Sequence, residues 1–185
     1  FKFLHTSVFW LLLGFVILGF ILRTHSFTDI TFGYDQARDA IIASNIWKGD
    51  LKILGPNSDI HGLHHGALYW YLISPFYVLF GGSVEAVKLF LIIGSLFLIP
   101  ITYVLSKKIF GSTLIALSSA FLVTVSYEAI SYSRWLSNPS LAMVTIALSF
   151  LFLWMYVKEN YKWGLLLTAF FWGISIQFQI FLLYQ

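Results

Sequence analysis

Long apolar segments constrain the fold of this chain more than any other feature of its sequence. A helix that crosses a bilayer needs about 20 consecutive, mostly apolar residues. Four segments reach that length, at residues 3–22, 84–106, 139–157 and 163–184. A fifth segment, 112–128, is shorter but carries no charge before Glu128. We therefore predict an all-α fold, a polytopic membrane helix bundle with about five transmembrane helices.

The composition excludes a soluble domain and several kinds of site. Of the 185 residues, 59% are hydrophobic and 10% are charged, and a soluble core of this size cannot bury so much apolar surface. Cysteine is absent, which excludes disulfides, zinc–thiolate sites and thiol nucleophiles. The net charge of +3 is small, so it bears on membrane topology rather than on a nucleic acid partner. Because the chain begins without Met and ends inside an apolar segment, we interpret it as the N-terminal transmembrane portion of a longer protein, with the C-terminal remainder missing.

Two clusters of positive charge predict how the segments cross the membrane. Lys107–Lys108 and the segment KENYK at 158–162 lie in short loops, and such basic loops are cytoplasmic. Residues 1–22 then form the first span, residues 23–83 an outer loop and residues 84–185 four further spans. We expect a multi-pass protein of the cytoplasmic membrane whose active site faces outside.

A shorter apolar segment, ALYWYLISPFYVLF, lies within the outer loop. Its uncharged core of about 13 residues contains Pro75 and is bracketed by Gly66 and Gly81–Gly82. That length is short for a span and typical of an interfacial or re-entrant helix. We predict a juxtamembrane helix, because a crossing here would turn the Lys107–Lys108 pair outward.

Charged residues gather at the start of another helix in the same loop. The stretch YDQARDAIIASNIWKGD predicts about four helical turns that end near Gly49. Asp35, Arg38 and Asp39 share one face of this helix, at positions i, i+3 and i+4. In one interpretation Asp35 caps the helix, Arg38 pairs with it and Asp39 favours the helix dipole. In the other, Asp35 is a general base at the membrane surface.

Histidines follow this helix in the segment LGPNSDIHGLHHGALYWYL. His61, His64 and His65 would suit a metal ion only if the segment were helical, and Gly62 and Gly66 oppose a helix. We expect surface histidines, or hydrogen-bonding partners for a phosphate or a sugar, and no metal site.

Aromatic residues and a second polar loop complete the outer side. Tyr69, Trp70 and Tyr71 form an aromatic belt in one interpretation and a platform for a sugar or prenyl group in the other. In the loop SYSRWLSNP at 131–139, Asn138 or Ser137 caps the helix that follows. Arg134 either extends to lipid headgroups or holds a lipid phosphate with its planar guanidinium.

Together these features resemble the GT-C glycosyltransferases, in the branch that contains the protein O-mannosyltransferases and the lipid A aminoarabinose transferases. The resemblance covers nearly the whole chain and rests on the order and sidedness of four motifs. These are Asp35-Gln36 after the first helix, HHGALYWYLISPFYVLFG, LSKKIFG and RWLSNP.

The resemblance implies the reaction and the partners. Such enzymes take a sugar from a polyprenyl-phosphate donor and transfer it with inversion to a lipid, glycan or protein acceptor. The expected partners are therefore this donor, the acceptor and membrane lipid, and no nucleic acid partner is expected. Asp35 takes the place of the first residue of the family's Asp-Glu pair, which implies that it is the catalytic base, and Gln36 stands at the second position. No cofactor is expected, and the alternative of a divalent metal ion stays open.

The resemblance also bears on substrate binding. The Lys-Pro-Pro that often precedes the aromatic helix is replaced by His65-Gly66-Ala67, so the Lys that contacts phosphate is missing. Lys52, His64, His65 or Arg134 would take its place. The full set of predicted substrate-binding residues is Arg38, Asp39, Lys52, His64, His65, Tyr69, Arg134 and Asn138.

Two other classes of membrane protein are alternatives. A transporter or flippase would carry ionisable residues near the middle of its spans, or broken helices in paired halves. The nearest polar residues here are Gln177 and Gln179, and Pro100 is the mid-span proline. In a non-catalytic membrane subunit Asp35 would be only a helix cap.

Overall fold

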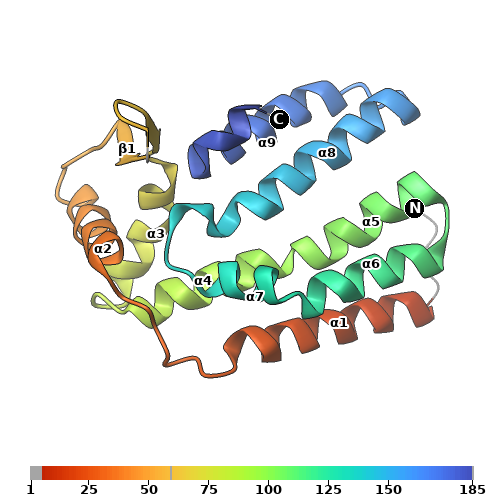
Figure 1. Cartoon of the computed structure of the whole chain (residues 1–185), viewed down its shortest axis with the longest axis horizontal. Coiled ribbons are helices and arrows are strands. Elements are labelled where there is room, and N and C mark those ends of the chain that lie inside the picture. Colours follow the sequence, from red (N-terminus) through yellow and green to blue (C-terminus); the bar gives the residue numbers. More distant parts are fainter. Residues whose placement is uncertain (1–5, 59, 185) are drawn as a thin grey trace.

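The computed structural model describes residues 6–58 and 60–184, and most of them are helical (Figure 1). The α-helices are α1 (Thr6–Thr24), α2 (Tyr34–Ile46), α3 (Leu68–Leu79), α4 (Val84–Leu96), α5 (Leu98–Phe110), α6 (Thr113–Val125), α7 (Tyr127–Arg134), α8 (Ala142–Glu159) and α9 (Gly164–Phe178). The strands are β1 (Leu54–Asn57) and β2 (His64–Gly66), and 3-10 helices lie at Asn138–Leu141 and Ile180–Tyr184. Residues 1–5 of the predicted first span lie outside the described part of the chain.

The long helices lie side by side, and the other elements gather at one end of the molecule (Figure 1). α8 packs along α9 and α5, α5 packs along α6, and α1 packs along α6 and α4. We call the end that carries α2, α3 and the β1–β2 hairpin the α2 end. The turns at 107–113 and 159–164 lie at the opposite end, the lysine end, where Lys108 Nζ lies 2.6 Å from Glu159 Oε1. The two basic loops are therefore on the same side of the bundle, as the topology prediction requires.

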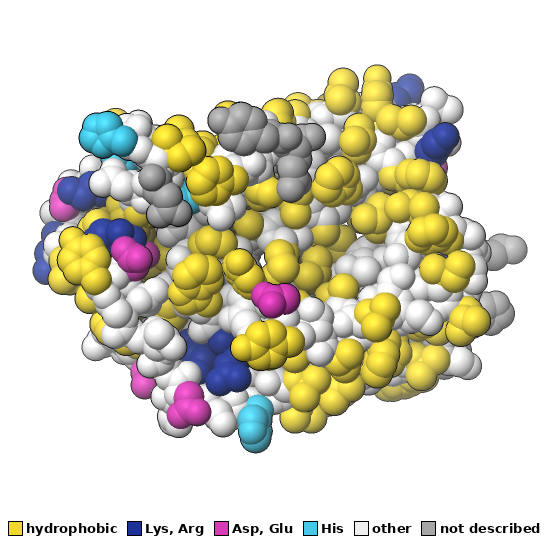
Figure 2. Space-filling view, in the orientation of Figure 1, with side chains coloured by type: hydrophobic (Ala, Val, Ile, Leu, Met, Phe, Trp, Pro, Cys, Tyr) yellow, Lys and Arg dark blue, Asp and Glu magenta, His cyan; other side chains and the backbone are white. Residues whose placement is uncertain are grey.

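Among the described residues, three helices are long and apolar enough to cross a membrane, at Ser7–Thr24, Val84–Phe110 and Asn138–Glu159. Hydrophobic side chains cover much of the surface over the long helices (Figure 2). A fourth span forms if α6 and α7, which meet at an angle of 50°, are counted together. The prediction of an all-α membrane bundle is confirmed, with three to four spans. Segment 163–184 is shorter than predicted, because α9 ends at Phe178 and Gln179 has extended backbone angles.

The bend between α6 and α7 corrects the predicted span 112–128. Ser126 has an extended backbone, and its Oγ accepts a hydrogen bond from Ala129 N at 3.3 Å, which caps a new helix. Helix α6 therefore ends at Val125, and α7 occupies part of the region predicted as the loop 131–139. Ser137 lies at the predicted N-cap position of the 3-10 helix that contains Pro139, but its side chain forms no capping hydrogen bond, and the helix begins at Asn138 rather than at Pro139.

The predicted acidic helix is confirmed as α2, but its cap is not Asp35. Gly33 is the N-cap residue, and its backbone N donates to Gln36 Oε1 at 2.9 Å, which is half of a capping box. Asp35 lies inside the first turn, where a carboxylate favours the helix dipole. The helix ends at Ile46, and the chain turns at Gly49, whose φ of 92° favours glycine.

A β-hairpin, which was not predicted, lies between α2 and α3 in the outer loop. β1 and β2 pair antiparallel, with Leu54 opposite Gly66 and Asn57 opposite His64. Only glycine fits at position 55, because a Cβ there would collide with the Gly66 carbonyl. His64 and His65 lie on a strand, so their side chains do not share the helical face that a metal site would need.

The predicted juxtamembrane helix is confirmed as α3, whose 12 residues are too few for a span. It packs between α2 and α4, and its buried side chains Tyr69, Trp70, Ile73 and Tyr77 form the centre of the core at the α2 end. This packing, rather than the helix's own length, stabilises α3.

Candidate active site

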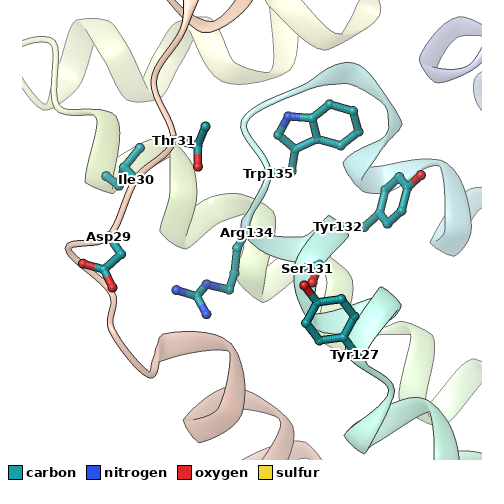
Figure 3. Close-up of a pocket in the computed structure, with 8 residues that line it drawn as sticks. All are labelled: Asp29, Ile30, Thr31, Tyr127, Ser131, Tyr132, Arg134 and Trp135. Carbon is teal, nitrogen blue, oxygen red and sulfur yellow. The ribbon is translucent and has the colours of Figure 1, made fainter.

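A pocket of about 790 Å³ opens at the α2 end between α7 and the α1–α2 connection (Figure 3). Its walls consist of Asp29, Ile30 and Thr31 from the connection and Tyr127, Ser131, Tyr132, Arg134 and Trp135 from α7 and the residue that follows. The volume is within the range of small-molecule sites, about 300–1,000 Å³. The pocket therefore combines a cation, a carboxylate and three aromatic rings in one concave surface.

Arg134 is the cation of this pocket, and its guanidinium points toward the α1–α2 connection (Figure 3). Nη2 donates to the Ser26 carbonyl at 3.1 Å. Within the described residues no carboxylate forms an ion pair with it. A guanidinium carries five N–H donors in a planar fork, so donors remain for an anionic ligand.

Lys88 holds the backbone of the α1–α2 connection, which forms the wall of the pocket opposite α7. Its side chain on α4 is buried, and Nζ donates to the carbonyls of Phe27 at 2.6 Å and Asp29 at 2.8 Å. Arg134 and Lys88 thus hold the same connecting segment through three of its carbonyls, those of Ser26, Phe27 and Asp29. Lys88 is not among the residues predicted from the sequence, although a lysine inside an apolar segment indicates a specific partner.

Aromatic side chains line the α7 wall of the pocket. Tyr132 and Trp135 pack edge to face with ring centroids 5.6 Å apart, and Tyr127 is exposed. Aromatic faces of this kind suit an apolar chain or the C–H face of a sugar.

The acidic start of α2 forms a charged cluster around Arg38. Arg38 Nη1 lies 2.7 Å from Asp35 Oδ1, and Nη2 lies 2.8 Å from Asp39 Oδ1. Trp70 Nε1 donates to the same Asp39 oxygen at 2.7 Å. The predicted pairing of Arg38 with Asp35 is therefore confirmed, and Arg38 also pairs with Asp39.

The two carboxylates of this cluster differ in accessibility. The Asp35 side chain is 62% exposed, whereas that of Asp39 is 3% exposed. Burial raises the pKa of Asp39, although hydrogen bonds from Trp70 and Arg38 oppose the rise. Its Oδ2 has no hydrogen-bond partner among the described residues. Only Asp35 is open to a substrate in this conformation.

A hydrogen bond joins the acidic cluster to the loop of the pocket. Gln36 Nε2 donates to the Leu136 carbonyl at 3.3 Å, across 100 residues of sequence. Thr31 in the pocket wall is two residues from the N-cap Gly33. Asp35 itself does not line the pocket, but its helix starts at the pocket's edge.

The other predicted binding residues lie on or beside the hairpin. Lys52 Nζ pairs with Asp50 at 2.6 Å, and its backbone N and O contact Tyr71 Oη at 3.0 and 2.9 Å. His64 Nδ1 lies 3.2 Å from the Gly55 carbonyl. His65 Nδ1 accepts from Ile180 N at 3.3 Å and so connects β2 to the residues after α9. None of these three residues lines the pocket, and no group of three or more His, Asp or Glu side chains gathers within the described ranges.

Tyr69 and Asn138 are buried, so neither presents its side chain at the surface. Tyr69 is 1% exposed, and burial raises the pKa of its phenol well above the usual value, with smaller effects of Asp39 and Tyr77. The burial of Tyr69 and Trp70 does not fit an interfacial belt or a sugar platform, and Trp70 Nε1 instead donates to Asp39 on α2. Tyr71 alone of the three is exposed.

Comparison with known proteins identifies the family. The family model described as dolichyl-phosphate-mannose-protein mannosyltransferase matches residues 64–184, from β2 through the residues after α9. Curated proteins and solved structures give no match. The matched residues include the α7 wall of the pocket and Arg134, while Asp35, Arg38 and Asp39 precede them. Because the match covers more than half of the chain, the protein belongs to the dolichyl-phosphate-mannose-protein mannosyltransferase family and is an integral membrane glycosyltransferase of the GT-C type.

Proposed function

We propose that the protein transfers a sugar from a polyprenyl-phosphate donor to an acceptor hydroxyl on the outer side of the cytoplasmic membrane. The reaction inverts the anomeric carbon and uses Asp35 as general base. The observation that carries this proposal is that the Arg134 pocket lies beside the start of α2. The hydrogen bond from Gln36 to the Leu136 carbonyl holds the start of α2 in this position.

The donor phosphate would bind at Arg134. Its free N–H donors match two phosphate oxygens, and such charge-assisted pairs are stronger than neutral hydrogen bonds. Tyr127, Tyr132 and Trp135 would contact the first prenyl units or the sugar. As the bond between the anomeric carbon and the phosphate oxygen breaks, Arg134 stabilises the negative charge that develops on the phosphate.

The acceptor would approach from the side of Asp35. The acceptor oxygen forms its bond to the anomeric carbon on the face opposite the phosphate, and its proton passes to the Asp35 carboxylate. A single displacement of this kind inverts the anomeric centre. Arg38 holds Asp35 at 2.7 Å and so orients it. We propose that the transfer needs no cofactor, since a lipid phosphate is already an adequate leaving group.

The orientation in the membrane follows from the distribution of charge. The basic turns lie at the lysine end, and positive loops favour the cytoplasm, so the α2 end with its pocket would face outside. In the described chain, Asp35, Arg38, Arg134 and Lys88 all lie at that end.

The test uses the full-length protein in proteoliposomes with a radiolabelled polyprenyl-phosphate sugar and lipid, glycan and protein acceptors. We expect label to appear in one acceptor class and free polyprenyl phosphate to be released in equal amount. A parallel assay follows movement of the labelled donor across the bilayer. Movement of the donor without transfer would instead make the protein a transporter and refute the proposal.

A further inference from the structure

A second cavity lies at the other end of the bundle, in the groove between α5 and α8. Its volume is about 370 Å³. The lining residues are Leu105 and Ile109 from α5 and Phe150, Leu153, Trp154, Val157 and Lys158 from α8. All of them except Lys158 are hydrophobic, so the groove suits an apolar chain.

The groove starts at the lysine end and runs toward the middle of the bundle. α5 ends at Phe110 and α8 at Glu159, and the lining extends back along α8 to Phe150. Seven residues separate Phe150 from Val157, which corresponds to about 10 Å along a helix. Both helices belong to membrane-spanning segments, so this length lies at the depth of the acyl chains.

Lys158 places a positive charge at the lysine end of the groove. Lys158 has no carboxylate partner among the described residues, and its Nζ lies 5.9 Å from the centroid of the Trp154 ring. The adjacent Glu159 does not neutralise it, because Lys108 Nζ occupies both oxygens of Glu159 at 2.6 and 2.7 Å. Lys162 is exposed on the same turn, which adds to the positive charge.

We propose that this groove binds one anionic glycerophospholipid, with an acyl chain between α5 and α8 and the headgroup phosphate on Lys158. Basic residues at the mouth of an intramembrane groove favour anionic headgroups over zwitterionic ones. The site differs from the Arg134 pocket, which lies at the α2 end. It depends on the membrane location of the chain and not on the proposed reaction, so either can fail without the other.

The experiment measures quenching of Trp154 by brominated lipids in nanodiscs of unbrominated phosphatidylcholine. The signal of Trp154 is the difference between the wild-type protein and Trp154→Phe. We expect brominated phosphatidylglycerol to quench it at about a fivefold lower mole fraction than brominated phosphatidylcholine, since one lysine at a membrane surface contributes about 1 kcal/mol. Lys158→Gln should abolish this preference, and Lys48→Gln, which changes an exposed lysine in the turn after α2, should leave it unchanged.

A second measurement does not depend on the tryptophan variant. Native mass spectrometry of the detergent-purified protein should show one retained phosphatidylglycerol, and Lys158→Gln should lose it. Equal quenching by the two brominated lipids would overturn the proposal in favour of ordinary boundary lipid. Absence of quenching by both lipids would also overturn it, because another protein segment or a second copy would then fill the groove.

Discussion

Replacing Asp35 by Asn separates the catalytic role of this carboxylate from its structural role. The side chain is 62% exposed and forms one ion pair, with Arg38. An exposed ion pair contributes about 0–1 kcal/mol to stability, and a carboxylate in the first helical turn adds about 0.3–1 kcal/mol. The substitution should therefore lower the free energy of unfolding by no more than about 2 kcal/mol. A protein with a stability of about 5 kcal/mol would remain about 99% folded after that loss.

The effect on turnover should be much larger. The amide cannot accept the proton of the acceptor hydroxyl, so kcat should fall by about 10²–10⁴-fold, the usual effect of removing a general base. Unfolding of a few per cent of the molecules cannot produce such a decrease. The two quantities therefore distinguish a base from a residue that only stabilises α2.

Asp39→Asn is the matched control. The amide keeps an oxygen that can accept from Trp70 and Arg38, and the buried carboxylate has no access to an acceptor in this structure. Initial rates of transfer should therefore stay close to those of the wild-type protein. Thermal unfolding in detergent checks that both variants fold, and the radiolabelled transfer assay measures kcat. Near-normal turnover by a folded Asp35→Asn variant would remove Asp35 from the mechanism, and equal losses in both variants would contradict its assignment as the single base.

Three further predictions test the topology, the donor contact and the buried carboxylate. Cysteines introduced at Ser58 and Ser137 should react with an impermeant maleimide from outside and one at Ser112 only after permeabilisation, whereas external labelling at Ser112 would invert the proposed arrangement. Arg134→Lys keeps the charge but loses the planar fork, so the apparent donor affinity should fall by about tenfold or more, as expected for a charge-assisted hydrogen bond of about 1.5–3 kcal/mol; an unchanged KM for donor would assign Arg134 to headgroup contact alone. Because burial raises the pKa of Asp39 above its ordinary 3.8, the folded state is favoured while this group is protonated, and that contribution is lost as pH rises through the raised pKa. Relative to Asp39→Asn, the wild-type protein should thus lose thermal stability as pH increases above about 4, and a constant difference in unfolding temperature across that range would refute the pKa shift.

Local patterns in the sequence determined the membrane class, most helices and the sides of the bundle on which the loops lie. The apolar segments and the basic turns are signals within 20 or so consecutive residues, and they act regardless of what packs against them. The helix α2 was also predictable, because its charged first turn and its Gly49 stop are local. Its cap was missed because Gly33 has no side chain to signal that role, and Gln36 supplies the capping oxygen.

Tertiary structure decided which polar groups are exposed and which are buried. Asp35 and Asp39 look equivalent on the helix face, and only the packing of α3, which places Trp70 against Asp39, makes one accessible and the other not. Lys88 lies 59 residues from Asp29, and Arg23 lies 101 residues from the Thr124 carbonyl that it contacts at 3.3 Å. Contacts between residues so far apart in the sequence depend on how the helices are arranged in space. A pattern of neighbouring residues does not predict them. The candidate active site joins residues 29–31 to residues 127–135, so the sequence showed the residue types but not their assembly into one pocket.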